Sequence, residues 1–228
     1  MWHRLFVTAQ TDLKEALREG FGQDARRHGY RGSVPTWRKA NAAGDWLIVN
    51  VQSSSFSTSD SLRCVINISA APEPWLRWQR HRLGTKMPKS VTESLGLFRD
   101  RVHPTGTPAR VAGWWEVTDE SSAGGAATDM SVRMEEVGWA PLDVMLTRRG
   151  MLEKIRAGDL GLMKREDFDG FFACAEALLL MDAGPSDALE MCLARALEGV
   201  VPTQRESAEE FDAWVRSESR RDPITAGA

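Results

Sequence analysis

The 228 residues, of which 42% are hydrophobic and 27% charged, have the composition of an ordinary globular protein, which excludes a disordered or collagen-like chain and leaves enough apolar residues for a core without disulfide bonds. The formal net charge is −3, but residues 1–110 carry 17 Lys and Arg against 9 Asp and Glu, whereas residues 111–228 carry 12 against 23. Such an asymmetry occurs where a surface meets a nucleic acid or another charged partner, and equally where two halves complement each other within one fold.

The first predicted element is an amphipathic helix near the start of the chain. Leu13, Leu17 and Phe21 recur at helical spacing, so residues 9–28 are expected to form one helix that packs on the core. Gly29 follows at a position where a glycine commonly ends a helix. Beyond this glycine the chain is expected to continue in extended structure.

Three strands are predicted next, at 34–39, 45–52 and 62–69, and the short, turn-rich connections between them favour an antiparallel meander. Alternate residues of the second and third strands form an apolar face that should meet the first helix, namely Leu47, Val49, Val51, Leu62, Cys64, Ile66 and Ile68. The opposite face is mixed, and its notable polar members are Asn50, Gln52, Arg63 and Asn67.

The remainder of the chain is predicted to be mostly helical. A short helix is expected at 74–83, a fourth strand at 111–118 and a flexible loop at 119–129. The last helix should begin with a capping box formed by Ser207 and Glu210. Further helices are expected near 130–136, 141–157, 167–182, 187–199 and 208–220.

These elements predict an α+β fold with an antiparallel sheet of about four strands. The N-terminal helix should pack on one face of the sheet, and a helical subdomain should follow at the C-terminal end. Residues 1–160 would form the α+β core. Residues 161–228 would form a helical extension, an αα-hairpin and a terminal helix, that packs on this core as an integral part.

The order of motifs in the first two thirds of the chain resembles a known family. A helix is followed by a Gly-aromatic turn, a Trp-containing strand, a strand ending in Asn-x-Gln-Ser, a serine-rich loop and a later Trp-Trp pair. This order, over roughly residues 9–160, is similar to the bacterial domain of unknown function 4304. The residues that carry the resemblance are Gly29, Tyr30, Trp37, Asn50, Gln52, Ser53, Asn67, Trp114 and Trp115.

The resemblance implies a bacterial source and the same α+β layout, but it implies no reaction, cofactor or catalytic residue. By analogy with other small families of this type, it suggests an immunity or defence-associated role.

Motifs for catalysis, metals or cofactors are absent from the sequence, so we predict no catalytic residue, no metal and no cofactor. The cysteines Cys64, Cys174 and Cys192 lie in apolar patterns, where a buried thiol is expected and not a nucleophile. The four histidines, His3, His28, His81 and His103, are scattered at no ligand spacing. An Asp-Phe-Asp-Gly segment at 167–170 resembles part of a calcium loop, but acidic residues at a helix start explain it better.

Two groups of residues are candidates for binding. The first is the basic, Trp-containing segment 74–89, which could neutralise phosphates and stack on bases, or could instead anchor a helix in the core. Its candidate residues are Trp75, Arg77, Trp78, Arg80 and Arg82. The second group is the polar sheet face, which could contact a ligand or a peptide backbone, or could be an ordinary solvated face. Its candidate residues are Asn50, Gln52, Arg63 and Asn67.

The function expected from these observations is a non-enzymatic protein-binding module of the bacterial cytosol, with nine tryptophans as candidate contact residues. One alternative is a nucleic-acid-binding protein that uses residues 74–89, and a second is an enzyme with an unrecognised site. The first residues lack the apolar core of a signal peptide, and the most apolar run, 171–181, is too short to cross a bilayer. We therefore expect a cytoplasmic protein with a protein partner and no membrane contact, while the sequence leaves the oligomeric state open.

Overall fold

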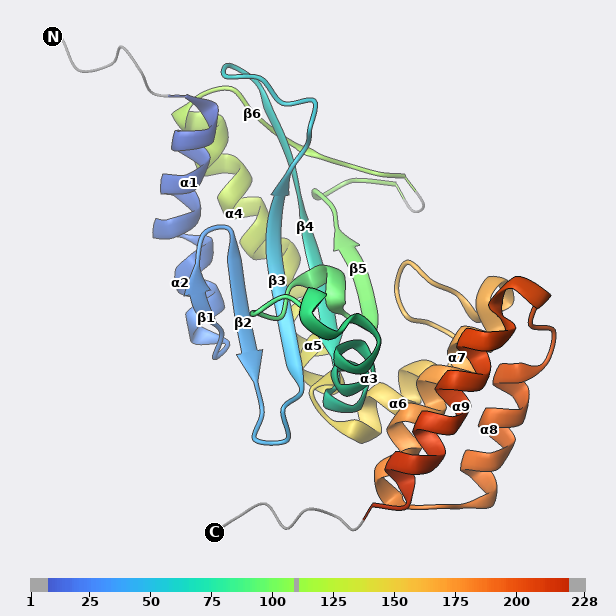
Figure 1. The fold of residues 1–228 in the computed structure, drawn as a ribbon. Coiled ribbons are helices and arrows are strands. Elements are labelled where there is room, and N and C mark those ends of the chain that lie inside the picture. Colours follow the sequence, from blue (N-terminus) through green and yellow to red (C-terminus); the bar gives the residue numbers. More distant parts are fainter. Residues whose placement is uncertain (1–7, 109–110, 222–228) are drawn as a thin grey trace, which may run out of the picture.

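The computed structural model describes residues 8–108 and 111–221. Its centre is an antiparallel sheet with helices on both faces, and the last three helices form a group beside one end of the sheet (Figure 1). The predicted α+β class is therefore confirmed. None of the helices in the described part of the chain is both long enough and apolar enough to span a membrane.

The sheet has six strands among the described residues, somewhat more than the four predicted. Strands β1 to β5 are neighbours in chain order, and β6 pairs with the first residues of β4. Every pairing is antiparallel. The strands are β1 (Arg31–Ser33), β2 (Thr36–Ala40), β3 (Trp46–Ser53), β4 (Leu62–Ala71), β5 (Phe98–Val102) and β6 (Trp115–Val117).

Strands β1 and β5 were not predicted, because neither has the alternation of apolar and polar residues that marks a half-buried strand. All three residues of β1 are exposed. In β5 only Phe98 and Val102 are fully buried, and three charged residues separate them. The predicted strand at 111–118 is confirmed only for its last part, since β6 begins at Trp115.

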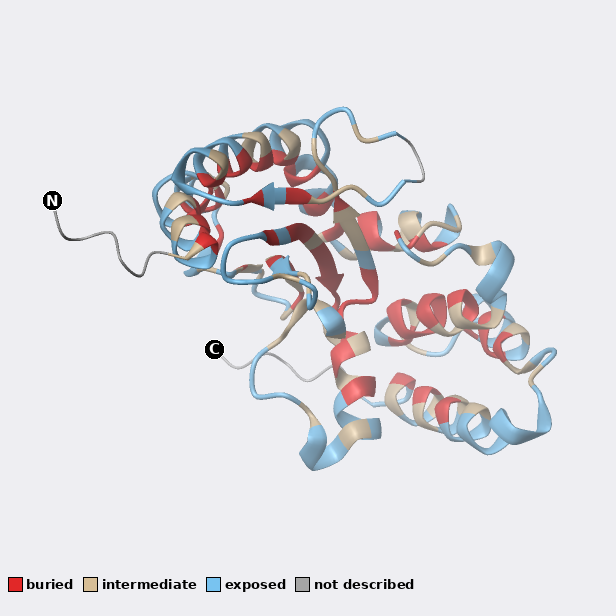
Figure 2. Cartoon of the chain, turned by 90° about the horizontal axis from the view of Figure 1, so that it is seen from above, coloured by how far each residue is buried: buried red, intermediate tan, exposed pale blue. Residues whose placement is uncertain are grey.

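One face of the sheet is covered by the first helices of the chain and by those that follow β6. The predicted contact between the apolar strand rows and the first helix is confirmed, because Leu13, Leu17, Val49 and Ile66 share one buried cluster. Figure 2 shows that the buried residues of these helices lie on the side that faces the sheet. The helices that contribute are α1 (Ala9–Glu19), α2 (Phe21–Arg27), α4 (Glu120–Val137), α5 (Trp139–Met145) and α6 (Arg148–Arg156).

Two helices that were predicted as continuous are each divided in two. The helix expected at 9–28 breaks at Gly20, whose torsion angles φ −101° and ψ −90° are not helical. The helix expected at 141–157 is replaced by α5 and α6. Thr147 separates them and caps α6, because its hydroxyl oxygen accepts a hydrogen bond from the Gly150 amide at 3.0 Å. The apolar spacing continued across both breaks, so the pattern alone did not reveal them.

The predicted flexible loop at 119–129 is wrong, because these residues form the first half of α4 and the helix expected at 130–136 is its second half. Asp119 and Ser122 form a reciprocal capping box. The Asp119 carboxylate accepts from the Ser122 amide at 2.8 Å, and the Ser122 hydroxyl accepts from the Asp119 amide at 3.0 Å. The buried stripe of α4 begins with three alanines, Ala123, Ala126 and Ala127. In a segment rich in Gly and Ser, these small residues gave too weak a hydrophobic signal.

We expect Gly124→Ala and Gly125→Ala to stabilise the protein by about 1 kcal/mol each, because glycine costs about that much in an exposed helix interior. Both glycines are exposed on α4, and an added Cβ at either position would meet no atom within 4 Å. Urea unfolding of each variant measures the change. The matched control is Gly150→Ala, where the Cβ would lie 2.1 Å from the Val144 carbonyl oxygen and should destabilise the fold. An unchanged or lower stability for both α4 variants would contradict the expectation.

The other helices are α3, which lies on the second face of the sheet, and α7 to α9, which lie beside one end of the sheet. The predicted short helix at 74–83 is confirmed as α3 (Glu73–Leu83), and the predicted hairpin at 167–199 is confirmed as α7 and α8. The capping box predicted at Ser207 is wrong, since α9 begins two residues earlier and no side chain caps it. The bounds are α7 (Arg165–Leu180), α8 (Asp187–Leu197) and α9 (Arg205–Ser219), with short 3₁₀ turns η1 (Gly84–Lys86), η2 (Glu93–Leu95), η3 (Met181–Ala183) and η4 (Pro202–Gln204).

Candidate functional site

The second face of the sheet is covered at one end only. There, Ile48 and Ala71 of the strands are fully buried against Leu76 of α3 and the segment that follows this helix. At the other end no helix of the described chain covers the strands (Figure 1), and Gln52 and Arg63 are exposed. This uncovered end, called the open face below, therefore carries the polar side chains that the strand alternation predicted.

Polar residues of four neighbouring strands form one row across the open face. Thr36, Asn50, Asn67 and Arg101 occupy directly opposite positions on β2, β3, β4 and β5. Asn50 is held at the β2 end, because its Nδ2 donates to the Thr36 hydroxyl at 2.8 Å and to the Pro35 carbonyl at 3.3 Å. Side chains on opposite residues of adjacent strands point to the same side of the sheet, so the row faces one surface.

Three side chains of this face are joined in a hydrogen-bonded relay. Arg101 Nε donates to Asn67 Oδ1 at 3.3 Å, and Asn67 Nδ2 donates to Gln52 Oε1 at 2.7 Å. A guanidinium group can only donate, so it sets the orientation of both amides. We call Arg101, Asn67 and Gln52 the amide–guanidinium relay. Its two ends are the Nη atoms of Arg101 and the Nε2 of Gln52, and both are donors.

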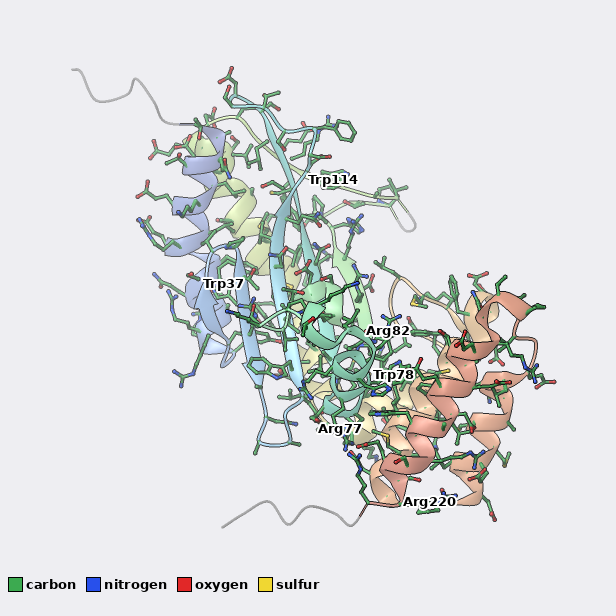
Figure 3. All side chains as sticks on the ribbon, in the orientation of Figure 1. Trp37, Arg77, Trp78, Arg82, Trp114 and Arg220 are labelled. Carbon is green, nitrogen blue, oxygen red and sulfur yellow. The ribbon has the colours of Figure 1, made fainter. Side chains whose placement is uncertain are left out.

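An indole ring lies beside the guanidinium end of the relay. The guanidinium carbon of Arg101 is 5.9 Å from the centre of the Trp114 ring, within the range of a cation–π contact. Trp114 is half-buried and lies next to the strands of the open face (Figure 3). In the described part of the chain no carboxylate pairs with the Arg101 guanidinium, although the Arg101 backbone amide donates to the Asp100 carboxylate at 2.8 Å. Arg63 differs, because it forms an ion pair with Glu116 at 2.8 Å.

A shallow hollow of about 410 Å³ adjoins the other end of the relay. Asn50 and Gln52 belong to its wall, together with apolar side chains of α1 and the turn before β2. Lys14 is its one charged residue, and no carboxylate of the described chain pairs with it. The hollow thus lies between α1, on the covered face, and the end of β3, and it borders the open face only at Asn50 and Gln52.

The predicted binding residues of the basic, Trp-containing segment lie elsewhere, on α3, where that helix meets the C-terminal helices (Figure 3). Both tryptophans are packed. Trp75 Nε1 donates to the Leu95 carbonyl at 2.7 Å, and Trp78, only 8% exposed, contacts the rings of Phe211 and Trp214. The structure thus does not bring these residues together with those of the open face.

The arginines of α3 are largely committed to neighbouring side chains. Arg77 forms ion pairs with Glu73 at 3.0 Å, with Glu218 at 3.4 Å and with Asp182. Arg80 lies 3.5 Å from Glu73. Arg82 donates to the Gln79 side chain at 2.9 Å and has no carboxylate partner among the described residues. Two of the three arginines are therefore at least partly neutralised.

A wide groove of about 1350 Å³ runs between α1 and α4 and has a strongly acidic lining. Carboxylates alternate there with small residues, and its lining contains no Lys or Arg. The acidic residues are Asp12, Glu15, Glu19, Asp24, Asp119 and Glu120. Hydrogen bonds from Ser122 to the Asp119 carboxylate hold the pKa of that group below its ordinary value. Four of these six acidic residues lie in the N-terminal half, which the charge totals alone did not indicate, and two of the four, Glu15 and Asp24, pair with Arg18 and Arg27.

The cysteines and histidines of the described chain form neither a reactive thiol site nor a metal site. Burial raises the pKa of Cys64 and of Cys174 to about 12, so both thiols stay protonated at neutral pH. Among the described residues, no three His, Cys, Asp or Glu side chains are placed to hold a metal ion. His3 lies outside the described residues.

Comparison with known families agrees with the resemblance inferred from the motifs. The model of the domain of unknown function DUF4304 matches residues 21–143, and the chain belongs to this family. The matched span includes the whole relay and Trp114, whereas α6 to α9 lie outside it. No curated protein and no solved structure matches the chain.

Proposed function

We propose that this chain is a non-enzymatic protein-binding module that contacts its partner with the open face of the sheet. The observation that carries the proposal is the amide–guanidinium relay, fixed in place beside Trp114 and left uncovered by the helices. Arg and Trp are the residue types most enriched among the side chains that dominate binding energy at protein interfaces. Preorganised polar groups also lose less conformational entropy on binding.

The chemistry of the relay favours binding over catalysis. It consists of two amides and one guanidinium, groups that serve as hydrogen-bond donors and acceptors. Proton transfer by a side chain requires a group whose pKa lies near the working pH. The relay can therefore orient and hold a partner group, and it supplies no general acid or base of its own.

The proposed setting is the bacterial cytosol, with an immunity or defence role for the complex. This part of the proposal is supported by the resemblance to the bacterial domain of unknown function 4304 and by the analogy with other small families of this type. Nucleic-acid binding by residues 74–89 remains the alternative, with Arg82 as the cation of α3 that has no carboxylate partner in the described chain.

A photo-crosslinking experiment tests the proposal in cells of the source organism. The crosslinking amino acid p-benzoylphenylalanine is placed at Glu116, which is 61% exposed on the open face. We expect a crosslinked species larger by the mass of a partner protein, and its yield should fall at least several-fold when Arg101→Ala is introduced as well. The wild-type Arg101 side chain is only partly buried, so the fold should persist in the Arg101→Ala protein.

The matched control places the same crosslinker at Arg149, which is 90% exposed on α6, away from the open face. A yield of the same protein adduct at both positions would show random collision and would contradict the proposal. Adducts with nucleic acid alone at Glu116 would favour the alternative class. The melting temperature of each variant confirms that the comparison involves folded proteins.

A further inference from the structure

We infer that the group recognised by the relay is a carboxylate, so that the partner presents an acidic side chain to Arg101. This inference rests on the proposed function and names the partner's chemistry at the same site. It follows from the direction of the hydrogen bonds in the relay, from the free donors of the guanidinium group and from the charges around it.

The direction of the relay leaves donors at both of its ends. Arg101 occupies Asn67 Oδ1, so the other end of that amide donates and occupies Gln52 Oε1. The reversed orientation would place an Asn67 NH₂ against a guanidinium N–H, two donors facing each other. The Gln52 Nε2 is therefore the outward end. A relay that offers only donors at its ends is complementary to a group that offers only acceptors.

The guanidinium end has the geometry that a carboxylate requires. Arg101 uses Nε for Asn67, and its guanidinium carbon lies 5.9 Å from the centre of the Trp114 ring. Both Nη atoms lack a carboxylate partner in the described chain, which leaves a planar pair of donors. Two parallel N–H donors match the two oxygens of a carboxylate, and this bidentate pair is stronger and more directional than a single charge-assisted bond.

The surrounding charges favour one carboxylate over a phosphate backbone. Five arginines of the strands lie on this side of the sheet, namely Arg31, Arg38, Arg63, Arg99 and Arg101. Arg63 is paired with Glu116, and Arg38 donates to the Val91 carbonyl at 2.6 Å. Arg31 and Arg99 are exposed, but Arg31 lies on β1, at the other end of the strand order from Arg101 on β5. Binding a nucleic acid generally needs several cations in register with successive phosphates. A face with one fixed guanidinium and a neighbouring Glu116 suits a single carboxylate better.

The test uses a displayed library of random 12-residue peptides selected on the wild-type protein, followed by synthetic copies of the strongest binders. We expect the binders to share an Asp or Glu, and the change of that residue to Asn or Gln should weaken binding about tenfold, the factor that corresponds to about 1.4 kcal/mol. The same peptide change should have no effect on the Arg101→Ala protein. This loss of coupling identifies the two groups as partners.

Two further proteins make the test specific. Arg101→Lys keeps the charge but removes the planar pair of donors, so it should restore at most a small part of the affinity. Arg149→Ala, which removes a 90% exposed arginine on α6, should bind as the wild type does. The melting temperatures of all three variants should stay close to that of the wild type.

Several results would overturn the inference. Binders without an acidic residue, or an equal effect of the peptide change on wild-type and Arg101→Ala proteins, would show that another group is recognised. If those binders still required Arg101, the proposed function would stand and only the carboxylate would be wrong. Displacement of the peptide by a short duplex DNA at near-physiological salt, lost in Arg101→Ala, would assign the site to phosphates. A failure to select any peptide would overturn the inference, and the crosslinking experiment would decide the proposed function separately.

Discussion

A chain that ends at Arg165 is expected to be insoluble or unfolded. The helices it would lack complete the core that the sheet helps to form, because Phe172, Ala175 and Leu179 of α7 belong to the same buried cluster as the strands. The indole of Trp78 would also lose Phe211, its edge-on partner at 5.1 Å. Full burial of one large apolar side chain contributes about 1.5–3 kcal/mol. The loss of several such side chains approaches the whole stability of a typical domain, about 5–15 kcal/mol.

The truncation is checked by the soluble yield and by urea unfolding of any soluble product. Point variants in the full chain separate burial from simple removal of helix. Phe172→Ala, at a fully buried position, should cost about 3–5 kcal/mol. The matched control is Met191→Ala on α8, where the side chain is 72% exposed and the change should be below about 0.5 kcal/mol. A truncated chain that stayed monomeric with an unchanged melting temperature would show that α7 to α9 form a separate attached unit.

The central part of the fold could be predicted because its local patterns agree with its tertiary contacts. In β4 alternate residues are apolar along the whole strand, and in β3 they are apolar at Leu47, Val49 and Val51; these are the residues that the first helices bury. The N-terminal helical segment had a clear apolar stripe, although its break at Gly20 was missed. Where the hydrophobic pattern and the tertiary packing agree in this way, the sequence is sufficient to predict the element and its buried face.

The elements that were missed depend on neighbours that the local sequence does not reveal. Strand β5 carries Arg99, Asp100 and Arg101 in succession, and it is a strand because it pairs along β4. The first half of α4 reads as a loop because its buried residues are alanines, which bury little area but fit closely against α1. In both segments tertiary pairing outweighs a weak local preference.

The candidate site was predicted only in part, because only some of its strands were recognised in the sequence. Asn50, Gln52 and Asn67 were placed on one face because their strands were recognised, and the structure does bring Asn67 and Gln52 within a hydrogen bond. Arg101 was missed with its strand, although its polar side chain two residues after Arg99 hinted at a solvated face. Trp114 was noted only as part of a family resemblance, since nothing local indicated that it would contact Arg101.

The arginines of α3 show why surface charge could not be predicted from the sequence. Its arginines looked free in the sequence because their partners are remote in the chain. Asp182 and Glu218 lie 105 and 141 residues beyond Arg77, yet both carboxylates pair with it in the fold. A cluster of cations in a sequence is therefore a poor guide to surface charge unless the acidic residues that pack against it are known.

Stability is expected to fall steeply above pH 9, because two cysteines are buried as neutral thiols. Burial raises the pKa of Cys64 and of Cys174 from an ordinary value near 9 to about 12. Between these values the unfolded chain loses the two protons while the folded chain keeps them, so raising the pH favours unfolding. Each thiol costs about 1.4 kcal/mol per pH unit in this window, or about 5 kcal/mol for both between pH 9 and 11. Below pH 8 both thiols are protonated in the folded and the unfolded chain, so their contribution to the free energy of unfolding no longer changes with pH.

Urea unfolding under reducing conditions at pH 7.5, 9, 10 and 11 measures this decline. The matched protein is the double variant Cys64→Ala, Cys174→Ala, in which neither position can ionise. Its stability at pH 7.5 should be lower than that of the wild type, because the buried sulfur of Cys64 and the partly buried sulfur of Cys174 are lost. Its decline with pH should be shallower by about 2–3 kcal/mol per pH unit, the slope that two buried thiols produce. Tyr30 remains in both proteins, and since burial also raises its pKa, it adds the same loss to each above pH 10. The difference between the two slopes therefore isolates the thiols, and equal slopes would show that both are free to ionise in the folded protein.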